Sequence, residues 1–253
     1  MKIGIVGKGG VGKTSVSSLL SRVLSERGRR VVAVDTDSNP NLGLSLGLSV
    51  EETERQAPIP RSVVIGHRGD LTVRELLDTY ATATPMGPLL MSALRVTQAG
   101  AGCTCGGHAS VRSMLGAAME EIADDTIIDM EAGIEHLSRS GGTLAKVDFL
   151  VLVFEASRKA VVTASRTIAL ARELGIPAWL GVANKIEPDE VSTVHSLCEE
   201  YDVPLDIVLP RFEAIVEADQ AGTPLARSAA PEVWEIFGEL ADRLSAGASA
   251  NPR

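Results

Sequence analysis

The segment with the clearest chemistry is "GKGGVGKT", from Gly7 to Thr14. It matches G-x-x-x-x-G-K-[ST] and lies between a short apolar run and a helical pattern, where its glycines let backbone N–H groups turn toward phosphate oxygens. Lys13 can then reach the outer phosphates, and Thr14 can ligate magnesium. This context favours a nucleotide site over a glycine-rich turn without a ligand, with predicted contacts at Gly7, Gly9, Gly10, Val11, Gly12, Lys13, Thr14 and Ser15.

A second candidate site is the pair Cys103 and Cys105, in "AGAGCTCGGH" at residues 99–108. Two thiolates from one chain supply half of a closed tetrahedral sulfur site, which takes four. A twofold dimer would place this segment of both subunits at its axis and complete a four-cysteine site. Flanking glycines and a loop position favour metal binding over two small buried hydrophobic side chains.

Two further residues are assigned differently. His108 is either an additional ligand or polar surface, and the second is more frequent for a single histidine near a turn. Cys198 falls in an amphipathic pattern at 189–201. That pattern favours a place in the core over a role as a ligand.

The elements that must position these residues follow from the alternation of short apolar runs with helical patterns. Helices are predicted at 13–28, 159–175 and 189–201. We therefore expect an α/β fold, with a doubly wound, mostly parallel sheet and helices on both faces, in a single domain over residues 1–244. The predicted strands are 2–6, 30–37, 126–131, 147–156, 178–185 and 205–210.

Two segments depart from this alternation. Residues 51–125 carry helical patterns at 71–81 and 110–123 but no clear strand. They are expected to form a largely helical insertion on one face, which carries the cysteine pair. Residues 245–253, "SAGASANPR", are small and polar and are expected to be disordered.

Composition limits the classes of partner. The net charge of −9 argues against non-specific binding to nucleic acid or to an anionic membrane. The N-terminus "MKIGIVGKGG" lacks the features of a signal peptide, and no run approaches the roughly 18 apolar residues of a membrane span. A cytoplasmic location is expected, where thiols stay reduced, and this favours a metal or redox role for the cysteine pair over a disulfide.

Lys8 directly follows the first glycine of the phosphate loop, and the string "KGGVGKT" resembles the deviant Walker A ATPases. That family includes MinD, ParA, the nitrogenase iron protein and the ATPases of arsenite and tail-anchored protein handling. The resemblance implies a MinD-like P-loop fold, ATP and ADP as ligands with Mg2+, and a nucleotide-dependent homodimer. It also implies that Lys8 crosses the dimer interface to the partner's nucleotide. Electrostatics alone would equally place an exposed lysine beside an anion site.

The same resemblance extends to acidic residues at two strand ends. In "VDTDSNPNLG" (34–43) it implies that Asp37, in switch I, orients or activates the attacking water and that Asp35 lies near the magnesium. A carboxylate at a strand end can hold such a water in line with the γ-phosphate. In "TIIDMEAGIEHL" (126–137) it implies that Asp129 holds magnesium through water and that the N–H of Gly133, in switch II, responds to the γ-phosphate. The alternative for Asp35 and Asp129 is a solvated strand end.

Two later segments resemble the family's adenine side. "VANK" (182–185) would offer Asn184, with Lys185, to the adenine ring. "LPRF" (209–212) would place Pro210 and Arg211 against the base.

The cysteine segment narrows the resemblance. "GAGCTCGGHASVRSML" (100–115) is similar to the G-x-G-C-x-C segment and leucine-bearing helix of the CooC group, the nickel-insertion ATPases that mature carbon monoxide dehydrogenase. "DMEAGIEHLSR" (129–139) is also closer to CooC than to MinD or ParA. The resemblance implies that nucleotide closes the dimer around one Ni2+ or Zn2+ ion, which is passed to a client nickel enzyme. CooC proteins commonly follow C-x-C with Pro-Glu-Asn, whereas this chain has Gly-Gly-His, and this leaves the metal and the client open.

Two other functions fit parts of the sequence. The first is a spatial-organising or partitioning ATPase like MinD or ParA, in which the cysteines are incidental or hold a structural zinc. The C-terminal stretch 231–253 is not rich in Lys or Arg, and the chain is acidic, so neither membrane nor DNA binding is favoured. The second is carriage of an iron–sulfur cluster by the four sulfurs of a dimer.

Overall fold

The apolar run at the N-terminus forms β1 (Lys2–Gly7), which lies at the centre of the sheet. It pairs in parallel with β5 (Asp125–Asp129) on one side and β6 (Phe149–Phe154) on the other. Ile3 and Ile5 point to one face of the sheet and Val6 to the other, as the two-residue period of a strand requires. The phosphate loop therefore starts from the middle of the sheet.

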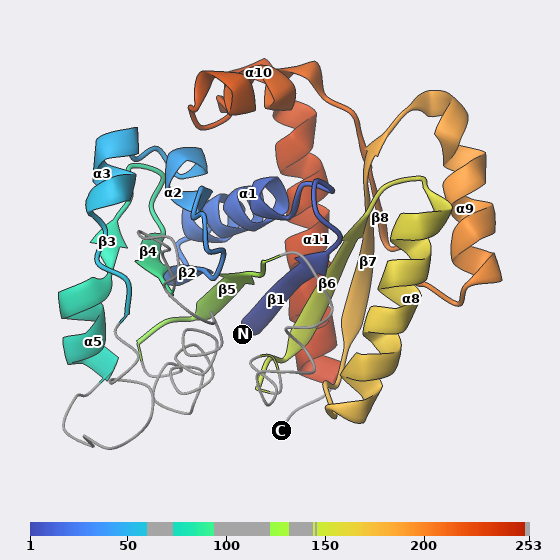
Figure 1. Ribbon diagram of the computed structural model, residues 1–253, viewed down its shortest axis with the longest axis horizontal. Helices are drawn as coiled ribbons and strands as arrows, with labels where there is room; N and C mark the ends of the chain where they lie inside the picture. The colour runs from blue at the N-terminus through green and yellow to red at the C-terminus, as the bar shows by residue number, and fades with distance from the viewer. Residues whose placement is uncertain (60–72, 94–121, 132–143, 145, 251–253) are drawn as a thin grey trace, which may run out of the picture.

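The computed structural model describes residues 1–59, 73–93, 122–131, 144 and 146–250 (Figure 1). The described elements are β1, α1 (Lys13–Glu26), β2 (Val31–Asp35), α2 (Leu42–Ser45), α3 (Val50–Arg55), α5 (Val73–Tyr80), β3 (Thr82–Ala83), β4 (Leu89–Ser92), β5, β6, α8 (Arg158–Glu173), β7 (Trp179–Ile186), the 3-10 turn η2 (Pro188–Glu190), α9 (Val191–Glu200), β8 (Ile207–Pro210), α10 (Glu213–Ala221), the 3-10 turn η3 (Arg227–Ala229) and α11 (Pro231–Ala250).

The strands form one eight-stranded sheet in the order β3-β4-β2-β5-β1-β6-β7-β8. Every neighbouring pair is parallel except β3 and β4 at one edge. Chain order reverses at β1, since β2 lies to one side of it and β6, β7 and β8 lie to the other. Ligands of such sheets bind at the carboxyl ends of the strands beside this reversal. The predicted fold class is confirmed.

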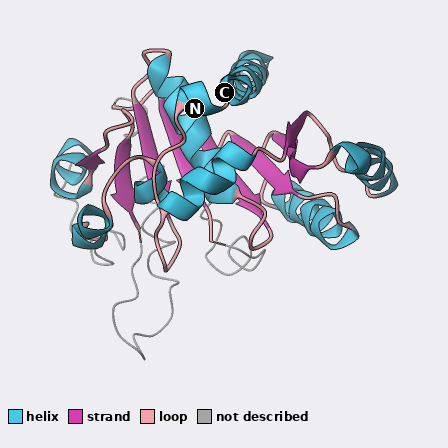
Figure 2. Cartoon of the chain, turned by 90° about the horizontal axis from the view of Figure 1, so that it is seen from above, coloured by secondary structure: helices cyan, strands magenta, loops and turns pink. Residues whose placement is uncertain are grey.

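Helices cover both faces of the sheet (Figure 2). On one face, α1 and α11 pack their apolar side chains against Ile3, Ile5 and Val151. On the other, α8 and α9 pack against Leu150, Leu152 and other residues that point the opposite way. Each central strand is buried on both faces, which explains why the strands read as continuous apolar runs.

The expectation of a strand-free insertion over 51–125 is wrong for its described part. This segment contributes β3 and β4 to the sheet, and β4 pairs in parallel with β2. Leu90 and Met91 are buried on opposite faces of β4. A four-residue strand has no helical or alternating pattern long enough to be recognised, and only its place beside β2 decides its structure.

The expected disordered tail is also corrected. Helix α11 continues through Ala250, so only residues 251–253 lie outside the described part of the tail. Leu244 is fully buried, and an ideal Cβ on Gly247 would lie 2.9 Å from the ring of Phe149. Small residues thus let this end of the helix pack closely on the sheet. Among the described helices, none combines the length and hydropathy needed to span a bilayer.

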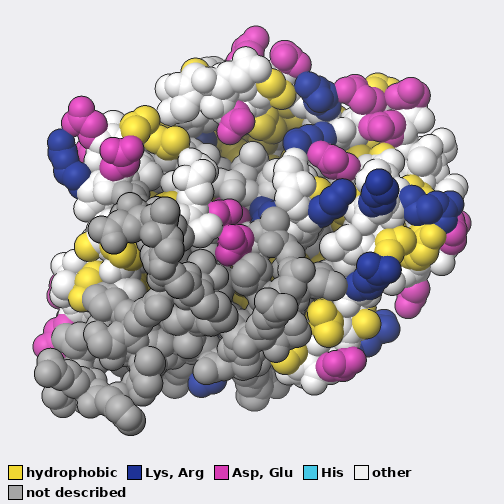
Figure 3. Space-filling view, viewed as in Figure 1, with side chains coloured by type: hydrophobic (Ala, Val, Ile, Leu, Met, Phe, Trp, Pro, Cys, Tyr) yellow, Lys and Arg dark blue, Asp and Glu magenta, His cyan; other side chains and the backbone are white. Residues whose placement is uncertain are grey.

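Cationic side chains are prominent on one part of the surface. Figure 3 shows Lys and Arg on the right of the view, over β7, α8 and α9, with Asp and Glu among them. In the chain from β6 to the start of α10, ion pairs join Arg158 with Glu200, Lys185 with Glu155 at 3.2 Å, and Arg211 with Glu187 at 3.7 Å.

Candidate nucleotide-binding site

The phosphate loop joins the end of β1 to the start of α1. Gly12 is the N-cap residue of α1, with φ 92°, and no side chain caps this N-terminal end of the helix. The N–H groups of the first turn therefore stay available to an anion. An ideal Cβ on Gly12 would lie 2.3 Å from Nδ2 of Asn184, so both its backbone angle and its surroundings require glycine.

Lys13 is the cation of this loop. Its side chain is buried, and Nζ donates to the carbonyl of Lys8 at 3.3 Å. Burial lowers the pKa of Lys13, and the nearby carboxylates, Asp129 first, oppose that shift. A phosphate beside Nζ would restore the favourable surroundings that burial removes. The side chain of Lys8 itself is exposed.

Two buried aspartates lie at the ends of adjacent strands, because β2 and β5 pair with Asp35 opposite Asp129. Oδ2 of Asp129 accepts from Thr14 Oγ1 at 2.7 Å, and Oδ1 accepts from Ser17 Oγ at 3.0 Å. Burial and, after it, the negative charge of Asp35 together raise the pKa of Asp129 to about 7, against the hydrogen bonds from Thr14 and Ser17 and the charge of Lys13. Two buried carboxylates without a cation are costly, and oxygen donors are the ligands that Mg2+ prefers, so Thr14, Asp35 and Asp129 fit a magnesium ion.

The loop after β2 is shaped by its own carboxylates. Asp35 accepts from the N–H of Asp37 and from that of Leu42, each at 3.0 Å. Asp37 in turn accepts from the N–H of Asn39 at 2.9 Å. Its side chain lines the nucleotide cavity described below. Asp37 is therefore held at the cavity by local backbone bonds.

This loop also contacts the segment after β5. Thr36 Oγ1 donates to the carbonyl of Asp129 at 2.8 Å, and Ser38 Oγ donates to Glu131 Oε1 at 3.1 Å. The two segments that the sequence assigns to switch I and switch II are thus hydrogen-bonded to one another at their starts. Gly133 lies outside the described residues.

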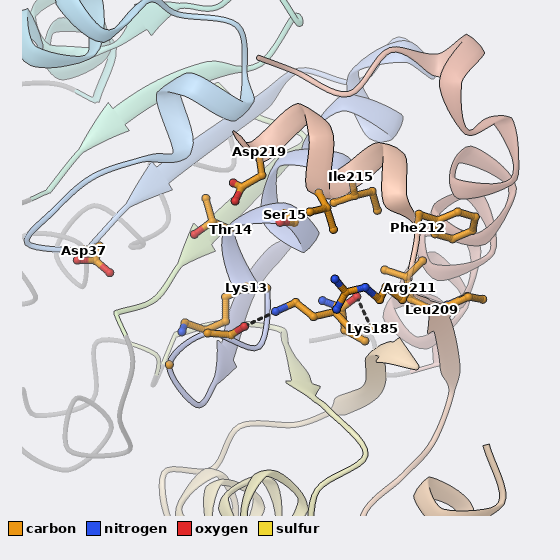
Figure 4. A pocket seen from close by; sticks show the side chains of 16 residues that line it. Lys13, Thr14, Ser15, Asp37, Lys185, Leu209, Arg211, Phe212, Ile215 and Asp219 are labelled. Carbon is orange, nitrogen blue, oxygen red and sulfur yellow. Dashed lines mark hydrogen bonds between the residues drawn. The ribbon is translucent and has the colours of Figure 1, made fainter. Parts of the chain in front are cut away.

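Asn184 and Lys185, at the end of β7, hold the phosphate loop as well as lining the cavity. Asn184 Nδ2 donates to the carbonyl of Val11 at 2.7 Å. Lys185 Nζ donates to the carbonyl of Gly10 at 2.6 Å (Figure 4). Lys185 also pairs with Glu155. The resemblance places the two residues at the adenine ring only. No sequence pattern indicates their hydrogen bonds to the phosphate loop, which lies more than 170 positions earlier in the chain.

One cavity of about 480 Å³, within the range of small-molecule sites, is lined by part of this set of residues, and Asp35 and Asp129 are not among its lining residues. Figure 4 shows Asp37 and Arg211 at opposite ends, with Lys13 between them. The cavity residues are Gly9, Gly10, Gly12, Lys13, Thr14, Ser15, Asp37, Asn184, Lys185, Leu209, Pro210, Arg211, Phe212, Ile215, Val216 and Asp219.

Five of these residues were not predicted as contacts: Leu209, Phe212, Ile215, Val216 and Asp219. Phe212 caps α10, and Ile215, Val216 and Asp219 lie on it. The signal was present in "FEAIVEADQAG" (212–222), an amphipathic stretch that ends in glycine, and Gly222 adopts φ 61° there. Helix α10 thus forms a wall of the cavity.

The sulfur chemistry falls elsewhere. Cys103, Cys105 and His108 lie outside the described residues. Within the described ranges, no group of three or more His, Cys, Asp or Glu is placed to hold a metal ion. Cys198 is buried in the core on α9, as predicted, and burial raises its pKa to about 11.

Comparisons with known proteins agree with this geometry. The family model of the CobQ/CobB/MinD/ParA nucleotide binding domain matches residues 4–225. The chain is 36% identical to the carbon monoxide dehydrogenase accessory protein CooC of Rhodospirillum rubrum, over 88% of each chain. It is 31% identical to an uncharacterized ATP-binding protein of Methanocaldococcus jannaschii, over 94% of this chain and 96% of the relative.

Solved structures share the fold. MinD of Pyrococcus horikoshii OT3, complexed with Mg-ADP, has a TM-score of 0.70 at 22% identity, covering 96% of this chain and 95% of its own. A ParA family ATPase of Chlorobium tepidum TLS has a TM-score of 0.74 at 19% identity, covering 95% and 98%. From its family match, its relatives and its phosphate loop, the chain belongs to the CobQ/CobB/MinD/ParA nucleotide-binding family and is a P-loop ATPase.

Proposed function

We propose that this ATPase is a metallochaperone that binds one Ni2+ or Zn2+ ion between two copies of the chain and delivers it to a metalloenzyme of the carbon monoxide dehydrogenase type. The observation that carries the proposal is the 36% identity to CooC over 88% of both chains. The CooC-like pair Cys103 and Cys105 supports it, since thiolates bind both metals well. MinD of Synechocystis is more distant, at 27% identity.

The nucleotide site supplies the driving reaction. The N–H groups of the phosphate loop and Nζ of Lys13 bind the phosphates, and Asp37 orients the attacking water. Lys8 reaches the nucleotide of the second copy. Magnesium, when bound, neutralises charge that develops on the phosphate oxygens. Thr14, Asp35 and Asp129 would hold this ion.

Hydrogen bonds join the loop after β2 to the end of β5 and to the segment that follows it. Thr36 and Ser38 tie the loop after β2 to the end of β5 and to Glu131. The cysteine pair precedes β5 in the chain, between β4 and β5. Nucleotide can drive metal capture only if it favours a closed dimer in which the cysteines of both copies meet.

The metal is cargo in this function. Each copy contributes Cys103 and Cys105, so the closed dimer provides four thiolates. The residues after Cys105, Gly-Gly-His, leave room for His108 as an additional ligand and make the choice between nickel and zinc a matter for measurement.

The test is an anaerobic titration of Ni2+ and Zn2+ with and without a non-hydrolysable ATP analogue, with metal content and molar mass recorded in the same samples. The proposal expects one ion per two chains, bound with dimerisation and lost in Cys103→Ser/Cys105→Ser. Cys198→Ala is the matched control, because the third cysteine is a core residue and its removal should leave the metal content unchanged.

A nucleotide-driven dimer whose metal content equals that of the double variant would refute metal delivery. It would leave a switch ATPase of the spatial-organising or partitioning kind. Visible absorption from an iron–sulfur cluster would refute nickel or zinc as the cargo.

A further inference from the structure

A second, smaller pocket adjoins the nucleotide cavity. It measures about 30 Å³, room for one water molecule, and lies where α10 faces α1. Ser15, Ile215 and Asp219 line both spaces. Arg22, on α1, lines the small pocket but not the nucleotide cavity.

Arg22 is a largely buried cation whose Nε lacks an acceptor. The residue is 6% exposed, its Nε is buried with no hydrogen-bond partner, and in the described part of the chain it forms no ion pair. Its guanidinium stacks on the ring of Trp234 at 5.0 Å. Glu26 is the nearby carboxylate, but its oxygens already accept from Arg227 at 3.0 Å and from Trp234 Nε1 at 3.2 Å. A buried guanidinium in this state is unfavourable, and an acceptor that reached it would be bound strongly.

The carboxylate that faces the same pocket is Asp219. It is exposed on α10 and, among the described residues, takes part in no ion pair. No residue of helix α10 is fully buried, and Ala214, Ile215 and Ala218 pack against the core while only partly buried, so α10 has fewer buried contacts than the core helices. Figure 4 shows Asp219 and Ile215 on α10 above Thr14 and Ser15, at the start of α1.

We propose that Arg22 is a positioning residue for the nucleotide and acts through Asp219. When nucleotide fills the cavity, α10 moves toward α1 and closes the small pocket. The carboxylate of Asp219 then pairs with the guanidinium of Arg22. The pair holds Ile215 and Val216 against the nucleotide and slows its release. This inference goes beyond metal delivery, because it concerns how long the ATPase retains its nucleotide whatever its cargo.

The nucleotide is needed because the Arg22–Asp219 ion pair by itself does not offset the free-energy cost of moving α10 toward α1. Without it, closure would strip water from Asp219 and leave the apolar side of α10 over an empty cavity. With it, Ile215 and Val216 bury apolar surface against the ligand, and the ion pair forms in a site from which water has been displaced.

The test is a double-mutant cycle on the release of a fluorescent ADP analogue with Mg2+, followed by stopped flow in the full chain. Arg22→Met and Asp219→Asn should each speed release by about three- to tenfold, and the double variant should release no faster than the faster single variant. Arg22→Lys should release more slowly than Arg22→Met, because it keeps the charge. Glu217→Gln, an exposed change on α10 that lines neither space, should release at the wild-type rate.

A second readout separates positioning from structural support. The nucleotide-free protein should lose little thermal stability in Arg22→Met, because removal of a buried cation with an unpaired Nε offsets the lost stacking on Trp234. Unchanged release in Arg22→Met, or rates in the double variant that multiply those of the single ones, would overturn the proposal. If Arg22→Met does not fold, the cycle of Arg22→Lys with Asp219→Asn applies the same criterion.

Discussion

At Asp129, a buried carboxylate that suits magnesium binding also lowers the stability of the metal-free fold. Its carboxylate is buried beside that of Asp35, with Thr14 and Ser17 as hydrogen-bond donors. The raised pKa means that the folded, metal-free protein binds a proton at a pH where the unfolded chain has released it. The stability that Asp129 contributes is therefore complete below about pH 4 and is lost as the pH rises through about 7.

Asp129→Asn should accordingly stabilise the protein in the absence of nucleotide and magnesium at pH 8, by an amount on the order of 2 kcal/mol, because it removes a buried charge. The gain should shrink toward pH 5, where the wild-type carboxyl is protonated. Urea unfolding at both pH values, with a chelator present, measures the difference. Equal gains at the two pH values would show that the charge of Asp129 is not its cause.

Glycines of the phosphate loop offer a second comparison at this scale. Gly10 and Gly12 both have positive φ angles, 83° and 92°, but only Gly12 lies against a neighbour, Asn184. Gly10→Ala should cost about 1 kcal/mol of unfolding free energy from backbone strain alone. Gly12→Ala should cost about 3 kcal/mol, since strain and displacement of Asn184 add. Chemical denaturation of the nucleotide-free variants tests this, and equal costs would mean that the contact with Asn184 is unimportant.

At the scale of elements, α11 is the helix that covers α1 and one face of the sheet. Phe237 is 2% exposed in this interface, whereas Glu239, two positions later, is exposed on the solvent side. The last described helix of the chain thus packs against the first strand–helix unit, which carries the phosphate loop.

Phe237→Ala should lower the free energy of unfolding by about 3–5 kcal/mol, because it leaves a cavity between α11 and the sheet. Glu239→Ala should change it by less than about 0.5 kcal/mol, since it alters only an exposed ion pair with Arg243. Thermal or urea unfolding of both variants decides between this packing and a loosely attached helix, for which the two changes would be alike.

At the scale of the whole molecule, the nucleotide cavity is a property of the folded chain only. Its walls come from the phosphate loop, α1, the ends of β7 and β8, and α10, which are more than 200 residues apart at the extremes. A ligand that needs all of these surfaces binds the native state and not the unfolded chain.

Mg-ADP at about 100 times its Kd should therefore add about 2.7 kcal/mol to the stability and raise the Tm by about 5–10 °C. Differential scanning fluorimetry gives the shift. Lys13→Ala should show a much smaller shift at the same ligand concentration, because the variant lacks the phosphate-binding cation. A full shift in Lys13→Ala would place the nucleotide elsewhere.

The sequence by itself determined the features that depend on short stretches of chain. The spacing from Gly7 to Thr14 identifies a phosphate loop because backbone freedom and helix start are local properties. The apolar runs of β1, β2 and β6 identify the sheet because strands buried on both faces are largely apolar.

Only the tertiary structure decided which of these stretches meet. The four residues of β4 are a strand because β2 lies beside them, and Lys185 holds Gly10 because strand order brings β7 to the phosphate loop. Likewise, Arg22 and Asp219 share a pocket only because α10 crosses over α1. Contacts between residues far apart in the chain depend on strand order and helix packing, which no local pattern encodes.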